Sequence, residues 1–195
     1  MNLDAAQWHA WHGATFPDES WYRDDDEQLC AIVGAPRVDL VSRERYGDFI
    51  LQFEFALPVG GNSGVFYRVD ESAGLAWHSG PEMQLLDDAV HPDGEEPTTR
   101  NGALYGLLAP EQETRIEPGS FMHAALVVRQ GTVEHWLGNR MVLSYRLDDP
   151  ALHTLIESSK FADKPLFAKA PTGHIVLQHH GEAVRFRRLS IEALG

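Results

Sequence analysis

The amino-acid sequence predicts an all-β protein: a two-sheet antiparallel sandwich with one short helix, formed as a single domain by residues 1–195. Three observations lead to this prediction. Hydrophobic and polar residues alternate with a period of two through most of the chain. Short turns that contain glycine separate several of these runs. Only one segment has hydrophobic residues at helical spacing.

The clearest strand is expected at residues 48–56. Its large apolar residues fall on one face, whereas Gln52 and Glu54 fall on the other. The apolar residues are Phe49, Leu51, Phe53 and Phe55. The sequence Gly60-Gly61-Asn62 then interrupts the chain, and alternation resumes at residues 63–69. We therefore expect these two strands to form a hairpin.

A meander is expected in the second half of the chain. The segments 124–129, 132–137 and 140–145 are separated only by Gln130-Gly131 and Gly138-Asn139, and such tight turns join antiparallel neighbours. Further strands are expected at residues 82–86, 103–108, 175–178 and 184–191. Nine or ten strands are more than one small sheet holds flat, so two packed sheets are predicted.

One helix is expected just after the meander. Asp149 is a suitable N-cap, Pro150 suits the first turn, and Leu152, Leu155 and Ile156 follow at helical spacing. The long polar stretch at residues 88–101 is expected to be a loop, and loops of this length often carry function.

Composition narrows the class of ligand and the compartment. The formal net charge of −13 disfavours nucleic acid and anionic lipid, whereas it is compatible with a neutral sugar. Cys30 is the only cysteine, so no disulfide within the chain is expected. No segment resembles a membrane span or a signal peptide. We expect a cytoplasmic protein as the sequence is written, or a periplasmic or secreted one if a leader was removed.

The first candidate catalytic residues lie in the segment GPEMQLLDD at residues 80–88. On a regular strand Glu82 and Gln84 share one face, and a β-bulge would bring Asp87 to the same side. Two carboxylates that converge in this way are what glycoside hydrolysis requires. The same pattern also fits solvent-exposed positions of an ordinary strand with Asp87 in a turn.

Residues near the C-terminus supply a second group of candidates. In the segment GHIVLQHHG at residues 173–181, Gln178 and His180 fall on one face and can bind hydroxyl groups or transfer protons. In the meander, His135 and Trp136 must point to opposite faces, and we expect Trp136 to be the core residue. No histidine pair has the spacing of a zinc motif, so the sequence alone predicts no metal site.

Seven short motifs, in order along the chain, resemble a known family over about residues 21–194. The motifs are Tyr46-Gly47-Asp48-Phe49, the GGNSGVFYR sequence at 60–68, the PEMQLLD sequence at 81–87, Gly102-Ala103-Leu104-Tyr105, Pro118-Gly119, His135-Trp136-Leu137, and the HIVLQ sequence at 174–178 continued through His180-Gly181 to Phe186-Arg187. Together they are similar to the 3-keto-disaccharide hydrolase domain, a family with a concanavalin A-like jelly-roll fold.

The resemblance implies an enzyme that cleaves glycosides whose sugar a partner dehydrogenase has oxidised at C3. A C3 ketone acidifies the C2 hydrogen, so a base can start an elimination that water addition completes. This chemistry needs a base, a group that stabilises the enolate, and an acid for the leaving oxygen. The candidates are Glu82 or His180 as base, Arg68 or Arg187 as enolate stabiliser, Asp87 or His135 as acid, and Asn62, Gln84, Tyr105 and Gln178 as hydroxyl-binding residues. No cofactor is expected, and a divalent metal remains open.

Two other functions are compatible with the sequence. Sandwiches of this kind also serve as lectins, and a non-catalytic carbohydrate-binding module would use aromatic platforms such as Trp77 or Tyr105. A conventional retaining glycosidase would use Glu82 and Asp87 as its carboxylate pair, about 5–5.5 Å apart.

Overall fold

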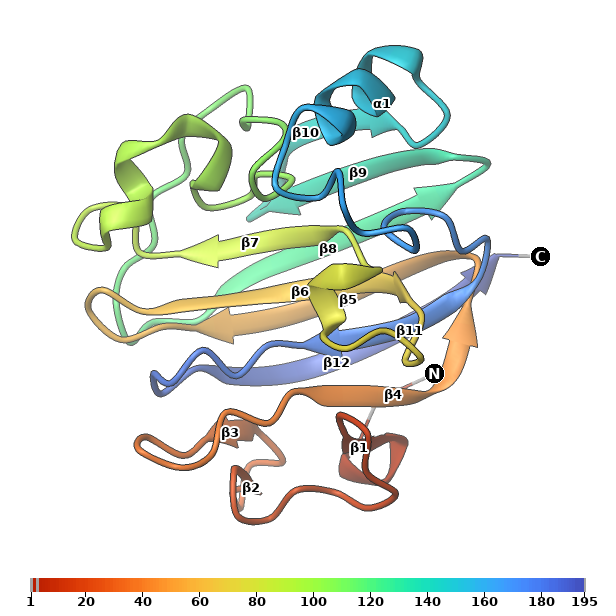
Figure 1. The fold of residues 1–195 in the computed structure, drawn as a ribbon. Coiled ribbons are helices and arrows are strands. Elements are labelled where there is room, and N and C mark those ends of the chain that lie inside the picture. Colours follow the sequence, from red (N-terminus) through yellow and green to blue (C-terminus); the bar gives the residue numbers. More distant parts are fainter. Residues whose placement is uncertain (1, 3, 195) are drawn as a thin grey trace.

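A computed structural model describes residues 2 and 4–194, and it confirms the predicted two-sheet antiparallel sandwich with one short helix. One sheet has five strands, in the order β1 (Trp8–Ala10), β4 (Leu40–Tyr46), β11 (Gly173–Leu177), β6 (Asn62–Val69) and β7 (Glu82–Leu86). The other has seven, in the order β10 (Arg140–Arg146), β9 (Thr132–Leu137), β8 (Met122–Arg129), β5 (Asp48–Ala56), β12 (Arg185–Leu194), β3 (Leu29–Ala31) and β2 (Trp21–Arg23). Figure 1 shows both layers.

The main core lies between the two sheets. The four apolar residues predicted on one face of β5 are buried there, and they pack against the inward residues of β6 and β7, which include Val65, Tyr67, Met83 and Leu85. A second, smaller apolar cluster contains Val41, Phe66 and Val176, which lie on three strands of the five-stranded sheet and point away from the main core. Because side chains alternate along a strand, this second cluster lies on the outer face of that sheet.

The meander β8–β9–β10 and the helix follow the sequence predictions. Strands β8 and β9 pair across Gln130-Gly131, and β9 and β10 pair across Gly138-Asn139. The helix α1 (Pro150–Glu157) begins after Asp149, whose carboxylate accepts a hydrogen bond from the Ala151 N–H group at 2.8 Å. Figure 1 shows α1 beside β10.

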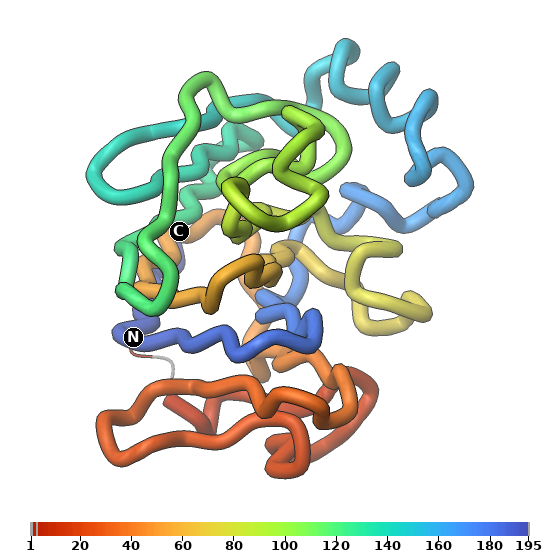
Figure 2. The backbone as a smooth tube through the Cα atoms, turned by 90° about the vertical axis from the view of Figure 1, so that its left-hand side faces the viewer, coloured from red at the N-terminus to blue at the C-terminus, as the bar shows by residue number. Residues whose placement is uncertain are grey.

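Two predicted elements are wrong. Strands β5 and β6 do not form a hairpin, because the segment between them carries the chain from one sheet to the other. Residues 103–108 do not form a strand: Leu104 makes only isolated bridges, to Met83 and Leu108, and the segment turns back on itself. The short strands β1, β2 and β3 and the longer β4 were not predicted, and all four lie at the opposite end of the molecule from α1 (Figure 2).

Short 3₁₀ turns shape the loops around the five-stranded sheet. They are η1 (Ala5–Gln7), η2 (Ala76–His78), η3 (Pro92–Glu95) and η4 (Pro97–Thr99). The last two lie in the polar stretch predicted as a loop. Within the described part of the chain, no helix has the length and apolar character needed to cross a membrane.

Candidate functional site

Polar residues form a row across the outer face of the five-stranded sheet. Gly64 on β6 pairs with Gln84 on β7, and the N–H group of Gln178 donates to the carbonyl oxygen of Gly64 at 3.0 Å. Gly64 and Gln84 therefore lie side by side on adjacent strands, and Gln178 lies next to Gly64 just after the end of β11. Glu82, two residues before Gln84, emerges on the same face.

This row forms the base of a small hollow of about 240 Å³. The residues that line the hollow come from strands of the five-stranded sheet and from loops, and these segments are far apart in the sequence. The lining residues are Asn62, Trp77, Glu82, Gln84, Asp93, Tyr105, Lys160, Gln178 and His180. Such a convergence of amides, carboxyls, aromatic rings and a lysine in one concavity is typical of a small-molecule site.

Glu82 is the acidic group most altered by its surroundings. The residue is 7% exposed. Burial raises the pKa of its carboxyl group to about 8, and the nearby Asp39 and Asp93 add to this effect, whereas Lys160 opposes it. A carboxyl group with a pKa near neutrality can accept and return a proton at physiological pH.

Two glutamine side chains in the hollow have buried atoms without protein partners. Gln84 is 1% exposed, and in the described residues neither its side-chain nitrogen nor its side-chain oxygen has a hydrogen-bond partner. The side-chain oxygen of Gln178 is also buried without one. Buried polar groups are normally hydrogen-bonded, so these atoms are available for a polar ligand.

Lys160 follows α1 and is surrounded by aromatic rings. Its Nζ atom lies 4.2 Å from the ring centroid of Tyr105 and 5.3 Å from that of Trp77. Burial lowers the pKa of its ammonium group, and the charges of Glu82 and Asp93 partly oppose this shift. The lysine therefore places an amino group in the same hollow as the Glu82 carboxyl.

The remaining titratable groups lie around the hollow. The Tyr105 hydroxyl donates to Oδ2 of Asp93 at 3.4 Å. The Nδ1 atom of His180 lies 3.1 Å from Oε2 of Glu182, and the His180 side chain is 39% exposed. His180 is therefore accessible to solvent protons, as is Lys160, which is also exposed.

The structure brings six of the ten sequence-predicted site residues together in this hollow. They are Asn62, Glu82, Gln84, Tyr105, Gln178 and His180. It also adds Lys160 and Asp93, which the sequence did not indicate. Both come from loops, where no hydrophobic alternation shows which way a side chain points.

The two predicted arginines do not reach the hollow. Arg68 donates to Oδ1 of Asp48 at 3.2 Å and to the carbonyl oxygen of Gly47. Arg187 belongs to the seven-stranded sheet, where its Nε atom donates to Glu54 at 2.6 Å and its guanidinium group lies over the Phe121 ring. Both arginines are held by structural contacts away from the lining residues.

Asp87 does not converge with Glu82. Strands β6 and β7 pair in regular register as far as Leu86, so the expected bulge is absent from these described strands. The Asp87 carboxylate instead accepts a hydrogen bond from the Gly60 N–H group at 2.8 Å and is 2% exposed. Asp87 therefore holds the turn that precedes β6.

His135 is buried in the core rather than placed in the hollow. It is fully buried, and its Nδ1 atom lies 2.9 Å from the carbonyl oxygen of Gly102. Burial lowers its pKa to about 4. Trp136, expected in the core, points outward instead, and its indole nitrogen donates to Glu134 at 2.8 Å.

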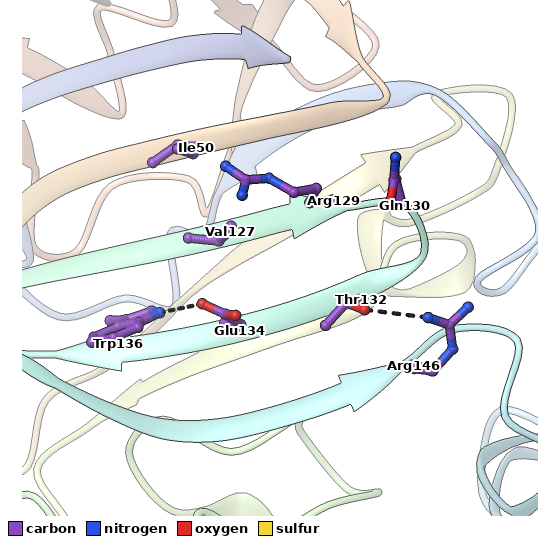
Figure 3. A pocket seen from close by; sticks show the side chains of 8 residues that line it. All are labelled: Ile50, Val127, Arg129, Gln130, Thr132, Glu134, Trp136 and Arg146. Carbon is purple, nitrogen blue, oxygen red and sulfur yellow. Dashed lines mark hydrogen bonds between the residues drawn. The ribbon is translucent and has the colours of Figure 1, made fainter. Parts of the chain in front are cut away.

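That outward side of the seven-stranded sheet carries a second depression (Figure 3). Its lining residues are Ile50, Val127, Arg129, Gln130, Thr132, Glu134, Trp136 and Arg146. The only carboxylate among them, Glu134, is already hydrogen-bonded to Trp136. The hollow on the five-stranded sheet therefore has more side chains that can transfer protons than this depression has.

No group of three or more metal-binding side chains that could hold an ion is found among the residues that the structure describes. The sequence-based expectations about cofactors and metals remain predictions.

Comparisons with known proteins agree with this fold. Residues 2–192 match the model of the 3-keto-alpha-glucoside-1,2-lyase-like domain. The chain is 30% identical over 179 residues to a protein of Bacteroides thetaiotaomicron named 3-keto-disaccharide hydrolase, with 80% of this chain and 62% of that protein covered. The chain thus spans less than two thirds of that relative's length.

Solved structures show the same architecture. A candidate glycosyl hydrolase of Parabacteroides distasonis has a TM-score of 0.89 at 25% identity, covering 98% of this chain and 90% of its own. The Bacillus licheniformis β-glucanase shares the fold alone, with a TM-score of 0.55 at 10% identity, covering 100% of this chain and 95% of its own. From the family match and the curated relative together, the chain belongs to the 3-keto-alpha-glucoside-1,2-lyase-like domain family.

Proposed function

We propose that this chain cleaves glycosides of 3-keto sugars, and that the reaction takes place in the hollow on the five-stranded sheet. The observation that carries the proposal is Glu82: a buried carboxyl group with a pKa of about 8 beside amides that lack protein partners. The name of the Bacteroides relative supports the substrate class.

The chemistry begins at C2 of the keto sugar. The ketone at C3 makes the C2 hydrogen acidic, so a base can remove it as a proton and leave an enolate. The enolate then expels the oxygen substituent at C1, and water adds to C1 to complete a net hydrolysis. Because the ketone is essential, an enzyme that oxidises the C3 hydroxyl group must supply the substrate, which is the role expected of a sugar 3-dehydrogenase.

The residues of the hollow fit the three needs of this reaction. Glu82 is the base, because its carboxyl group is buried and its pKa lies near neutrality. Lys160 supplies positive charge beside the ketone, a role for which Arg68 and Arg187 lie in the wrong places. His180, at the solvent-accessible side, protonates the departing oxygen.

The amides of the hollow hold the sugar. Gln84 and Gln178 present buried atoms without protein partners, and Asn62 lines the same space. An amide both donates and accepts hydrogen bonds, so each can bind a sugar hydroxyl group. Such contacts fix the ring with its C2 hydrogen toward Glu82.

The same geometry argues against the other two functions. A retaining glycosidase would need Asp87 opposite Glu82, but Asp87 holds the Gly60 N–H group. A lectin would stack its ligand on Trp77 or Tyr105, but Lys160 lies over both rings. The structure therefore has neither the carboxylate pair of a retaining glycosidase nor the open aromatic surface of a lectin.

The test compares release of the aglycone from a 3-keto glucoside and from the matching ordinary glucoside. We expect release only from the keto compound, and we expect Glu82→Gln to lower kcat by roughly 10²–10⁴-fold. Glu117→Gln is the matched control, because Glu117 is exposed on a loop away from the hollow. Binding of both compounds without release from either would favour the lectin function instead.

A further inference from the structure

The amino group of Lys160 has an unusual position for a lysine. Three aromatic rings surround it: the centroids of Tyr105, Phe161 and Trp77 lie 4.2, 5.2 and 5.3 Å from Nζ. In the described residues no carboxylate lies within ion-pair distance of this amino group, whereas Lys164 pairs with Asp163 at 2.9 Å. Lys160 is therefore held in place by rings and is not tied to a carboxylate.

The same amino group shares a hollow of about 240 Å³ with the Glu82 carboxyl. A sugar ring that fills this hollow would therefore lie beside both groups. The substrate proposed above carries a ketone, and a ketone is the functional group that a neutral amine attacks.

We propose that Lys160 forms a covalent imine with the C3 ketone of the substrate, so that an iminium ion rather than the ketone acidifies the C2 hydrogen. This inference rests on the proposed function and adds a covalent step to it.

The steps balance in atoms and electrons. The neutral amine adds to C3, and the ketone oxygen takes one proton from the amine and one from solvent and leaves as water, which gives a protonated imine. Glu82 removes the C2 proton, and the C–H electrons form an enamine. The enamine nitrogen then pushes electrons toward C1, the C1–O bond breaks, and the departing oxygen takes a proton from His180.

The second half of the cycle restores the enzyme. Water adds to C1 of the unsaturated iminium ion and gives a proton to His180, which restores that acid. C2 then takes a proton from the Glu82 carboxyl group, which has exchanged its hydrogen with solvent after the aglycone left. A second water molecule hydrolyses the iminium bond, so that the 3-keto sugar leaves, one proton returns to solvent and the amine is free. One water molecule is released and two are consumed, which equals one net hydrolysis.

The surroundings of Lys160 suit both forms of its nitrogen. Burial is the largest influence on its pKa and lowers it, which increases the neutral fraction that can attack a ketone. Once the iminium ion forms, the positive charge faces the electron-rich surfaces of Tyr105 and Trp77. The Glu82 and Asp93 carboxyl groups lie close enough to influence the same nitrogen.

Reductive trapping tests the imine directly. The full chain is incubated with 3-keto-1,5-anhydroglucitol, a keto sugar that has no leaving group at C1, and with cyanoborohydride, which reduces iminium ions in preference to ketones. We expect one sugar to be added per chain, and peptide mass mapping should place it on Lys160. The chain has only three lysines, at positions 160, 164 and 169, so Lys164→Arg and Lys169→Arg are matched controls that should still be trapped.

Lys160→Arg supplies the second readout. Arginine keeps the positive charge but cannot form an imine, so we expect loss of trapping and a fall in kcat of roughly 10²-fold or more. Thermal melting verifies that the variant is folded. Conversion of a Lys160→Cys variant to thialysine with bromoethylamine should restore both trapping and turnover, because Cys30 is buried.

The outcomes separate the imine from the proposed function. Cleavage of 3-keto glycosides by the wild type, with no trapped adduct or with an adduct spread over all three lysines, would overturn the imine and leave the function intact. A Lys160→Arg variant that keeps most of its turnover would overturn it as well. If the wild type cleaves no 3-keto glycoside at all, the proposed function itself fails.

Discussion

The carboxyl group of Glu82 occupies the space in which a side chain on Gly64 would lie. A Cβ atom added to Gly64 would overlap Oε1 of Glu82 and lie 2.8 Å from its Cδ atom. Gly64 faces Gln84 across the β6–β7 pair. The absence of a side chain at this position therefore lets the carboxyl group lie flat over β6, at the base of the hollow.

Gly64→Ala should displace the Glu82 carboxyl group and reduce turnover by roughly 10²-fold, because the base no longer reaches the C2 hydrogen. Crowding should also cost about 1–3 kcal/mol of unfolding free energy. Steady-state kinetics and denaturant titration measure the two effects. Gly74→Ala is the control, since an added Cβ there would meet its nearest atom at 3.4 Å. Full activity in Gly64→Ala would show that the position of Glu82 does not matter.

The activity should rise with pH as Glu82 ionises. Burial raises the pKa of its carboxyl group to about 8, so at lower pH most molecules carry a protonated group that cannot accept a proton. We expect kcat/KM to increase roughly tenfold per pH unit until it levels near that value. A pH–rate profile that levels instead near the ordinary glutamate pKa, about 4.3, would contradict the assignment of Glu82 as base.

The same pKa shift predicts how stability depends on pH. The pKa of Glu82 in the folded chain is about 8, above its ordinary value of 4.5, so the unfolded chain loses this proton first as pH rises. The wild type should therefore lose stability relative to Glu82→Gln between these two values, by up to several kcal/mol at about 1.4 kcal/mol per pKa unit. Paired denaturant titrations at low and high pH measure the difference. A constant difference at all pH values would mean that Glu82 titrates normally.

Arg68→Ala and Arg187→Ala should change turnover by less than about threefold, because neither side chain lines the hollow. Their contacts with Asp48 and Glu54 are partly exposed, so each substitution should cost about 0–1 kcal/mol of stability. Kinetics on the 3-keto substrate distinguish these arginines from Lys160. A loss of turnover as large as that in Glu82→Gln would show that these arginines act in the active site.

His135→Ala should act on stability rather than on chemistry. The substitution leaves a cavity and removes the partner of the Gly102 carbonyl, so we expect a loss on the order of 3–5 kcal/mol. Calorimetry measures the loss, and kinetics below the melting temperature should show turnover reduced far less than in Glu82→Gln. Loss of turnover at unchanged stability would point to a catalytic role for the imidazole.

Strand alternation predicted the part of the site that lies on strands. Glu82 and Gln84 were placed on a shared face because they are two residues apart on a regular strand. Gln178 and His180 were placed in the same way at the end of β11, and all four side chains line the hollow.

Alternation does not reveal which face of a strand meets the core, nor where loops go. His135 and Trp136 alternate correctly, but both residue types tolerate burial, and the sequence favoured the wrong one for the core. Lys160 lies in an irregular segment, and only the folded chain brings it over Tyr105. Asp87 does not point toward Glu82, because the regular β6–β7 register places its carboxylate beside the N–H group of Gly60.

The hydrogen at C2 of the keto sugar reports directly on whether Glu82 acts as the base. A 3-keto disaccharide is cleaved in D₂O, and the released keto sugar is analysed by mass spectrometry at times short enough that a sample without enzyme shows no exchange. Removal of the C2 proton by Glu82 predicts one deuterium at C2 of the product, and cleavage and exchange that are both slowed to the same extent in Glu82→Gln. Cleavage by the wild type that leaves the original hydrogen at C2 would contradict the mechanism.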